Sequence, residues 1–419
     1  MRQLQSIGRA ITLKQPGLTV QRKQKYSPFL IALAYLSFVS LGLPDGLNGV
    51  AWPSIRDYFH LPVDALGSLL VMFTAGYLLS SFMSGRILAQ IGLGSLLALS
   101  CFGTSIGLLG YALAPAWWVM VALGVLSGLG AGAIDAGLNT FAASNFSARM
   151  VNWLHACYGV GAATGPVIMT SVLASGQVWQ SGYTVVAAWQ MLLALCFAVT
   201  ARLWPKQTTD VHQASETRIP NARTLKLPVM WISILVFFLY TGMEAAAGTW
   251  SYTLFTQSRA VTMMTAGFWV SVYWVALTVG RLLAGIAVGV VPANRLLRVC
   301  VAAMALGALA IWLNIANVVS FLGLGLLGLS SAPVFPSLIA TTPLRLGSEH
   351  VGNGVGFQIA AAVLGQSLLP ALIGVLAGKF GLESIGPSLF VFVVILVALV
   401  QLLTSSSLMA KDRAIADIA

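Results

Sequence analysis

The stretch SFVSLGLPDGLNGVAW, residues 37–52, places one aspartate, Asp45, in a run that is otherwise apolar, small or weakly polar. A helix of about 20 predominantly apolar residues is long enough to cross the hydrocarbon core of a bilayer. A charged aspartate at the centre of such a helix costs roughly 3 kcal/mol on insertion scales and marks an ion or substrate pathway by default. The stretch therefore predicts a membrane-spanning helix with a functional acid.

Two further stretches repeat this pattern. SGLGAGAIDAGLNTFAA, residues 127–143, contains Asp135, and FFLYTGMEAAAGTWSY, residues 237–252, contains Glu244. The whole chain has only 11 acidic residues, so three of them within apolar stretches require a reason. We predict that these three acids serve the movement of a solute or a proton across a membrane.

The composition excludes a soluble protein. Of the 419 residues, 58% are hydrophobic and only 8% are charged, whereas a soluble domain carries about 25% charged residues. The first 26 residues are basic and polar, which is not the pattern of a cleavable signal peptide. The net charge of +11 lies mostly in short loops and nowhere alternates with aromatic residues, so we expect it to orient the protein in the membrane, with no nucleic-acid partner.

The four cysteines predict free thiols. They all lie within apolar stretches and their spacing matches neither a disulfide framework nor a metal site. They are Cys101, Cys157, Cys196 and Cys300. We expect no metal and no cofactor, with a proton gradient as the driving force.

Twelve stretches are long and apolar enough to span a bilayer, and all are predicted to be helices because an open strand edge cannot lie in lipid. They fall near residues 29–53, 65–86, 93–113, 116–144, 151–174, 184–204, 228–256, 264–290, 297–314, 317–341, 351–377 and 385–408. The fold class is therefore an all-α membrane protein. If the N-terminus is cytoplasmic, eighteen Lys and Arg residues lie on the cytoplasmic side and three outside, with Arg281 inside a span. The positive-inside rule then predicts that both termini are cytoplasmic.

The longest polar stretch divides the chain into two halves of six spans each. We predict a basic cytoplasmic segment (1–26), an N-terminal six-helix bundle (27–204), a cytoplasmic linker (205–227), a C-terminal six-helix bundle (228–408) and a cytoplasmic tail (409–419). The halves resemble each other: GYLLSSFMSG at residues 76–85 matches GRLLAGIAVG at residues 280–289. Asp45 and Glu244 also match at a similar offset. These matches favour a duplication, with chance similarity between Gly- and Leu-rich helices as the alternative.

Twelve spans in two halves with a cytoplasmic linker resemble the major facilitator superfamily, over residues 27–408. Its fucose-permease-like branch of sugar/proton symporters is similar in three details. The first is an acid in span one with another in span four, Asp45 and Asp135. The second is NWLHACYGVGAATGP, residues 152–166, and the third is YTGMEAAAGTW, residues 240–250. The resemblance implies two pseudo-symmetric six-helix bundles, a monomer and a multi-pass location in a bacterial inner (plasma) membrane.

The chain also departs from the family pattern. The loop between spans two and three reads GRILAQIGLG, residues 85–94, where the superfamily usually has Gly-x-x-x-Asp-Arg-x-Gly-Arg-Arg. The charged residues of the usual cytoplasmic latch are therefore replaced. Asp135 also stands where fucose permease has a glutamate, so its shorter side chain could alter proton affinity or the substrate.

The resemblance implies that spans one, four, seven and ten line a central cavity, and helical spacing shows which polar groups share a face with the acids. Asn48 lies three residues after Asp45, and Asn139 lies four residues after Asp135. Sugar hydroxyls suit amide, imidazole and carboxylate partners, with an aromatic ring against the apolar sugar face. The predicted substrate-binding residues are Asn48, Asn139, His155, Tyr240, Trp250 and Gln358.

Proton coupling is predicted for Asp45, Asp135 and Glu244, chiefly for one of the two aspartates. Structural alternatives remain open at each position. Glu244 could pair with a polar group of the bundle, and Asp45 could cap a helix that is broken by the neighbouring proline. His155 could be a packing residue. Arg281 could extend to the cytoplasmic face, or balance the charge of Asp135 or Glu244.

The leading functional hypothesis is a secondary active transporter that moves a small polar solute, a sugar or related compound, by alternating access in symport with protons. The alternative is a proton-driven exporter of amphipathic or drug-like compounds, which the glycine-rich fifth span and the many aromatic residues permit. A sensor or scaffold that does not transport is a third alternative. No hydrolase, kinase or redox motif is present, so we expect no enzyme activity. The predicted partners are the solute, protons and the lipid bilayer.

Overall fold

The computed structural model describes residues 27–204, 220–287 and 291–405. The predicted N-terminal segment (1–26) and tail (409–419) lie outside the described residues, as does most of the predicted linker. Within the described residues, twelve helices are long and apolar enough to cross a membrane, and no strand is present. The prediction of an all-α membrane protein with twelve spans is confirmed.

The N-terminal spans are α1 (Pro28–Phe59), α2 (Leu66–Ile91), α3 (Leu93–Leu113), α4 (Trp117–Asn145), α5 (Ala148–Ala174) and α6 (Trp179–Thr200). The C-terminal spans are α8 (Pro228–Thr253), α9 (Met263–Ala287), α10 (Ala293–Leu313), α11 (Asn317–Ser331), α14 (Val351–Phe380) and α15 (Ile385–Leu403). Three shorter helices are α7 (Asn221–Leu225), α12 (Val334–Ala340) and α13 (Thr342–Leu346).

One predicted span is interrupted. The sequence predicts a single helix over residues 317–341, but the structure has α11 and α12 with a turn at Ala332 and Pro333 between them. Proline has no backbone N–H and its ring clashes with the preceding turn, so it often breaks a helix. The tenth span therefore consists of two helical segments.

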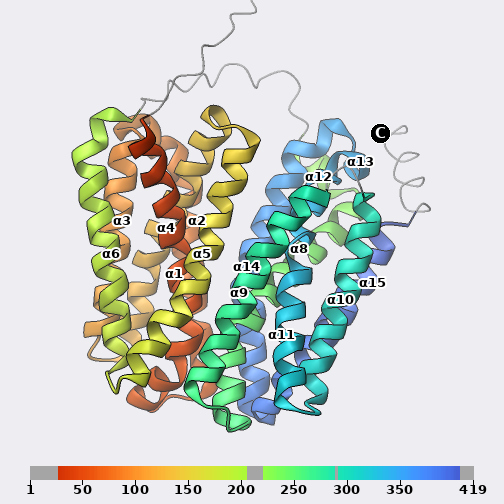
Figure 1. Ribbon diagram of the computed structural model, residues 1–419. Helices are drawn as coiled ribbons and strands as arrows, with labels where there is room; N and C mark the ends of the chain where they lie inside the picture. Colours follow the sequence, from red (N-terminus) through yellow and green to blue (C-terminus); the bar gives the residue numbers. More distant parts are fainter. Residues whose placement is uncertain (1–26, 205–219, 288–290, 406–419) are drawn as a thin grey trace, which may run out of the picture.

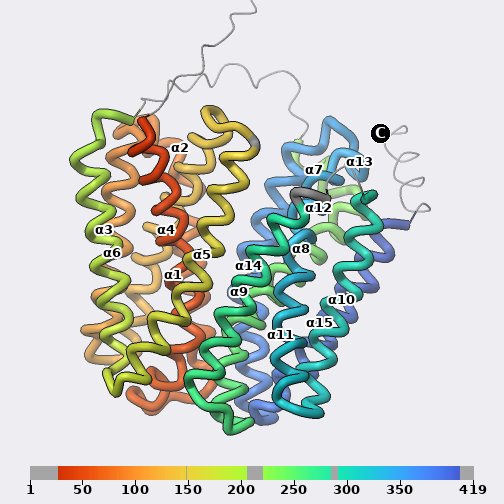
Figure 2. The backbone as a smooth tube through the Cα atoms, viewed as in Figure 1, coloured from red at the N-terminus to blue at the C-terminus, as the bar shows by residue number. Residues whose placement is uncertain are grey.

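The spans form two bundles of six, α1–α6 and α8–α15 (Figure 1), and the continuous trace in Figure 2 shows the same division. The pairing of helices repeats between the bundles. α1 packs on α5 as α8 packs on α14, α2 packs on α4 as α9 packs on α11, and α3 packs on α6 as α10 packs on α15. This repetition confirms the predicted pseudo-symmetric pair of six-helix bundles.

Glycines set the closest helix crossings within the N-terminal bundle. A Cβ atom on Gly161 of α5 would collide with the Val39 carbonyl of α1, and one on Gly128 of α4 would collide with the Phe73 carbonyl of α2. Small residues at such crossings allow the backbones to approach, which is how membrane helices associate without a hydrophobic driving force. The glycine-rich fourth and fifth spans are thus explained by packing.

We call the side on which α1 begins and α15 ends the near side, and the opposite side the far side. The bundles converge on the far side and diverge toward the near side (Figure 1). Arg56 donates a hydrogen bond to Gln257 across the far side, at 3.1 Å. In the seam between α5 and α9, Gly159 faces Thr278 and Thr170 faces Gly267.

The glycine crossing gives a test with a matched control. We expect Gly161→Ala to cost about 1–3 kcal/mol, the usual penalty for overfilling a packed interior, because the new methyl would meet the α1 backbone. Gly85 of α2 has no heavy atom near the position of a Cβ, so Gly85→Ala should gain roughly 0.5–1 kcal/mol from helix propensity. Thermal unfolding of both variants in detergent measures the difference; equal melting temperatures would contradict the crossing.

Candidate functional site

Both acids of the N-terminal bundle accept a hydrogen bond from a tyrosine on a neighbouring helix. The Tyr158 hydroxyl of α5 donates to Asp45 Oδ2 of α1 at 2.6 Å. The Tyr77 hydroxyl of α2 donates to Asp135 Oδ2 of α4 at 2.6 Å. Asn139 Nδ2 donates to Asp135 Oδ1 at 2.9 Å, as the spacing along the helix allows. Each aspartate is therefore held in a fixed orientation by neutral donors.

The acid of the C-terminal bundle has both a tyrosine and a cation. The Tyr240 hydroxyl, one turn earlier on α8, donates to Glu244 Oε2. Arg281 Nη2 of α9 donates to Glu244 Oε1 at 3.2 Å and forms an ion pair with it. The Tyr273 hydroxyl of α9 donates to the Glu244 backbone carbonyl at 2.7 Å. Arg281 thus balances the charge of Glu244, one of the alternatives left open by the sequence.

The acid sites of the two bundles approach one another where the bundles meet, with Asp135 near His155 of α5. Glu244 lies within electrostatic range of Asp45. Arg281 lies within electrostatic range of His155 and Tyr158, which belong to α5 of the other bundle. The helices α1 and α8, which carry Asp45 and Glu244, are themselves in contact. We call Asp45, Asp135, Glu244 and Arg281 the acid centre; it joins both halves of the molecule.

His155 combines packing with proximity to charge. Its ring meets Phe38 edge-on, with centroids 5.4 Å apart and an angle of 89°. It also lies within electrostatic range of Asp135 as well as Arg281. His155 therefore packs against α1 and also lies near the charged residues Asp135 of α4 and Arg281 of α9.

Two predicted substrate residues lie away from the acid centre. Trp250 is fully buried, and its Nε1 donates to the Pro370 carbonyl of α14 at 2.9 Å. Gln358 is also fully buried, and its Nε2 donates to Ser233 Oγ of α8 at 2.7 Å. Both hydrogen bonds join α8 to α14, so these side chains hold the C-terminal bundle together.

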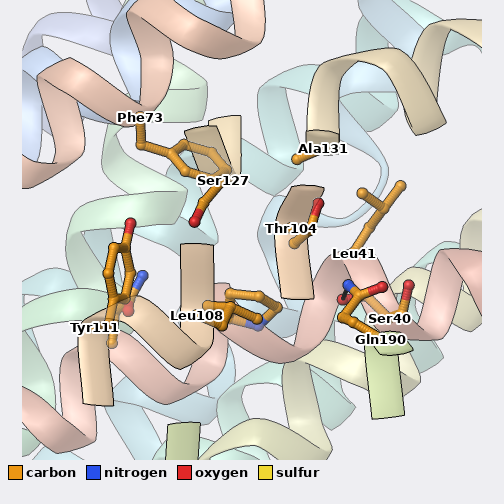
Figure 3. A pocket seen from close by; sticks show the side chains of 11 residues that line it. Ser40, Leu41, Phe73, Thr104, Leu108, Tyr111, Ser127, Ala131 and Gln190 are labelled. Carbon is orange, nitrogen blue, oxygen red and sulfur yellow. Dashed lines mark hydrogen bonds between the residues drawn. The ribbon is translucent and has the colours of Figure 1, made fainter. Parts of the chain in front are cut away.

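Asn48 lines a small cavity inside the N-terminal bundle. Its Oδ1 accepts a hydrogen bond from the Tyr183 hydroxyl of α6 at 2.7 Å. The cavity is lined by residues of α1, α2, α3, α4 and α6 (Figure 3). Asn48 and Asp45 are thus neighbours on one helix but have different surroundings.

Sequence reasoning missed the two tyrosines that hold the aspartates, Tyr77 and Tyr158. Both stand within apolar spans, which is a signal in itself, since the chain has only 10 tyrosines. Their pairing with Asp135 and Asp45 depends on how the helices are rotated and shifted against each other. Within the described residues, no group of three or more His, Cys, Asp or Glu side chains could hold a metal ion.

Outside the spanning helices, Arg345 of α13 is also buried, with 7% of its surface exposed. Burial lowers the pKa of Arg345 to about 10, so it remains charged at neutral pH. It adds a positive charge to the near side of the C-terminal bundle.

The comparisons with known proteins agree with this architecture. The family model described as Major Facilitator Superfamily matches residues 34–342. Bypass of stop codon protein 6 of Saccharomyces cerevisiae is 23% identical over 388 residues, which cover 84% of this chain and 77% of that protein. The glucose/mannose transporter GlcP of Bacillus subtilis is 19% identical over 352 residues, which cover 81% of this chain and 86% of that protein.

Solved structures show the same fold. The nucleoside transporter NupG superimposes with a TM-score of 0.72 at 13% identity, over 90% of this chain and 98% of that one. The D-xylose-proton symporter gives 0.71 at 14%, over 88% and 96%. The E. coli fucose:proton symporter FucP gives 0.61 at 14%, over 90% and 99%. At these identities the likeness concerns the fold alone.

The ion pair between Arg281 and Glu244 predicts that removing one partner lowers the stability more than removing both. Breaking a buried pair by removing one partner costs about 3–5 kcal/mol because the remaining charge is left unpaired, and we expect Arg281→Gln to lie near the lower end because 26% of its side chain is exposed. The double variant Arg281→Gln with Glu244→Gln should recover much of the loss. Arg86→Gln, at the exposed end of α2, is the control. Equal melting temperatures of the Arg281→Gln and Arg86→Gln variants would show that the ion pair does not stabilise the protein.

Proposed function

This chain belongs to the Major Facilitator Superfamily and is a transporter, and we propose that it carries a small polar solute, a sugar or polyol, in symport with protons. The acid centre is the observation that carries this proposal. Three carboxyl groups from both bundles lie in membrane-spanning helices, and each accepts a hydrogen bond from a tyrosine hydroxyl. In the part of the chain that the structure describes, only Glu244 has an ion-pair partner. Ionisable groups at such a position mark proton or substrate pathways.

The three acids have different roles in the proposed mechanism. Arg281 donates a charge-assisted hydrogen bond to Glu244 and forms an ion pair with it. Asp45 and Asp135 accept hydrogen bonds only from neutral groups in the described part of the chain. We assign the coupled proton to these two aspartates, because taking up a proton removes a charge that has no ion-pair partner in apolar surroundings. Glu244 and Arg281 then form the ion pair of the centre.

The chemistry around the acids suits a hydroxyl-rich solute. The carboxylates of Asp45 and Asp135 accept hydrogen bonds, and the groups that donate to them belong to Asn139, Tyr77 and Tyr158. A solute with several hydroxyls can replace these internal hydrogen bonds one for one, which keeps the polar groups of the site satisfied when the solute is bound. The names of the GlcP, xylose and fucose transporters support a sugar as the first class to test.

The charge distribution supports an orientation. Among the described residues, eight basic side chains lie at near-side helix ends or loops and three lie on the far side. The near-side residues are Arg86, Arg149, Arg202, Arg223, Lys226, Arg295, Arg298 and Arg345, and the far-side residues are Arg56, Arg259 and Lys379. By the positive-inside rule the near side is cytoplasmic. The helices of the two bundles diverge on that side (Figure 1), which is the arrangement we expect of the cytoplasm-facing conformation in alternating access.

Proton flux in sealed proteoliposomes tests the proposal. The vesicles contain a pH dye, and a panel of sugars, polyols and amphipathic cations is added outside. We expect one sugar or polyol to acidify the lumen, and Asp135→Asn and Asp45→Asn to abolish its concentrative uptake while exchange of labelled substrate persists. Asp57→Asn, whose side chain is 69% exposed on the far side, is the control and should behave as the unmodified protein.

Two results would contradict the proposal of proton-coupled symport. The first is normal accumulation in both Asn variants, which would remove the aspartates from coupling. The second is silence toward all sugars and polyols together with proton movement driven by amphipathic cations, which would identify an exporter instead.

A further inference from the structure

A groove lies between the two bundles toward the far side, where α2 begins and α14 ends. Its walls come from α2 and α4 of one bundle and from α14 of the other, and its largest apolar side chains are Val71, Met72, Val121, Leu372 and Val375. Its volume is about 570 Å³, within the range of roughly 300–1,000 Å³ that is usual for ligand sites. We call it the far-side groove; both halves of the chain form it.

The open face of the far-side groove meets lipid. Val71, Met72, Leu372 and Val375 are between 36% and 45% exposed, and all four lie within membrane-spanning segments. Because the bundles converge on the far side, the face of these helices that stays exposed there is the outer one. At this depth of a bilayer the surrounding medium is hydrocarbon, so the apolar walls suit the acyl chain of a lipid.

Two opposite charges stand at the far-side rim of this groove. Asp64, in the short turn of helix that precedes α2, lines the groove itself. Lys379 lies four residues after Val375 and seven after Leu372, so helical spacing places it on the same face of α14. A Cβ atom on Gly378, the neighbour of Lys379, would lie 3.6 Å from Asp64 Oδ1. An acid of one bundle and a base of the other thus meet at the same end of the groove.

These two charges do not pair with each other. Among the residues that the structure describes, the ion pairs involve Arg56, Arg259 and Arg281, and neither Asp64 nor Lys379 takes part in one. Asp64 is half-buried and Lys379 is exposed. A molecule that carries a cation and an anion at the end of an apolar chain would satisfy both side chains at once, and this is the design of a zwitterionic phospholipid.

We propose that the far-side groove binds a phospholipid of the far-side leaflet with an ethanolamine-type headgroup. Its acyl chain lies along the apolar walls, its ammonium group pairs with Asp64 and its phosphate pairs with Lys379. A primary ammonium group donates hydrogen bonds to a carboxylate, which the quaternary ammonium of a choline headgroup cannot do. A purely anionic headgroup would leave Asp64 without a cation. The charges at the rim therefore select the headgroup, and the walls accept the chain.

The bound lipid favours the conformation in which the far side is closed. The helices α2 and α14 pack tightly beside the groove, since a Cβ atom on Gly67 would lie 2.8 Å from the Cβ atom of Ala371. When the bundles separate on this side, the two walls part and the lipid loses half of its contacts. A ligand that binds one of two conformations shifts the population toward that conformation. The site acts in this way whatever solute the protein carries.

Photolabelling of the unmodified protein tests the position of the lipid. The protein is reconstituted with an ethanolamine phospholipid that carries a diazirine in its acyl chain, irradiated, and digested for mass spectrometry. We expect labelling around Met72 and around Leu372 to exceed labelling around Val391, which lies on the exposed face of α15 at a similar distance from the far-side end of its helix. Equal labelling of the three segments would mean ordinary surrounding lipid and would overturn the proposal.

Native mass spectrometry tests the headgroup. The protein is extracted from vesicles with equal amounts of ethanolamine and choline phospholipids that have the same acyl chains. We expect the unmodified protein to retain the ethanolamine lipid preferentially, and Asp64→Asn to lower this preference about two- to fivefold, as for a partly exposed ion pair. Lys379→Gln should lower the retention of both lipids, because both contain phosphate. Asp57→Asn, an exposed acid on the same side, is the control.

A matched pair of valine variants separates the groove from the rest of the lipid-facing surface. Val375→Trp fills the groove and should remove the retained lipid, whereas Val391→Trp on α15 should leave it in place. Equal retention in these two variants, or an unchanged preference for the ethanolamine lipid in Asp64→Asn, would overturn the proposal.

Discussion

The hydrocarbon core of a membrane supplies no water to polar groups, and the structure depends on this constraint at every level. The described spans satisfy it by forming helical hydrogen bonds, with one turn at Ala332 and Pro333 in the tenth span. Where Pro44 removes a backbone donor, Gln190 supplies one from another helix. The acids satisfy the same constraint by accepting hydrogen bonds from tyrosine hydroxyls and, at Glu244, by pairing with Arg281. The need to satisfy polar groups thus connects the fold to the proposed function. Tyr158 and Arg281, which hydrogen-bond to the acids, also lie where the two bundles meet.

Most of the fold could be predicted because it rests on local properties of the sequence. Hydropathy and length identified the spans, and the matches between Asp45 and Glu244 and between two Gly-containing segments indicated the duplication. The break in the tenth span was not predicted. Pro44 and Pro53 lie inside α1 without ending it, whereas Pro333 lies in a turn between two helices. The neighbouring helices decide whether a proline bends or interrupts a span, and the sequence does not state their positions.

The candidate site could be predicted only within single helices. The pairs Asp135–Asn139 and Tyr240–Glu244 are four residues apart, so helix geometry alone brings them together. The tyrosines that bind the aspartates come from other helices, and their contacts depend on relative rotation and depth. Trp250 and Gln358 were chosen for their residue types. Chemistry alone did not reveal that their polar groups bond within the C-terminal bundle.

The seam between α5 and α9 has a mechanical consequence. Its two glycine–threonine contacts are separated by eleven residues on each helix, Gly159 to Thr170 and Gly267 to Thr278. Eleven residues complete almost exactly three helical turns, so both contacts lie along one line about 16 Å long. In each contact the threonine side chain of one helix occupies the space left by the glycine of the other, so the two bundles approach closely along this line. In the proposed transport cycle this line would be the axis about which one bundle tilts against the other, and a larger side chain at Gly159 or Gly267 would hinder that change of state.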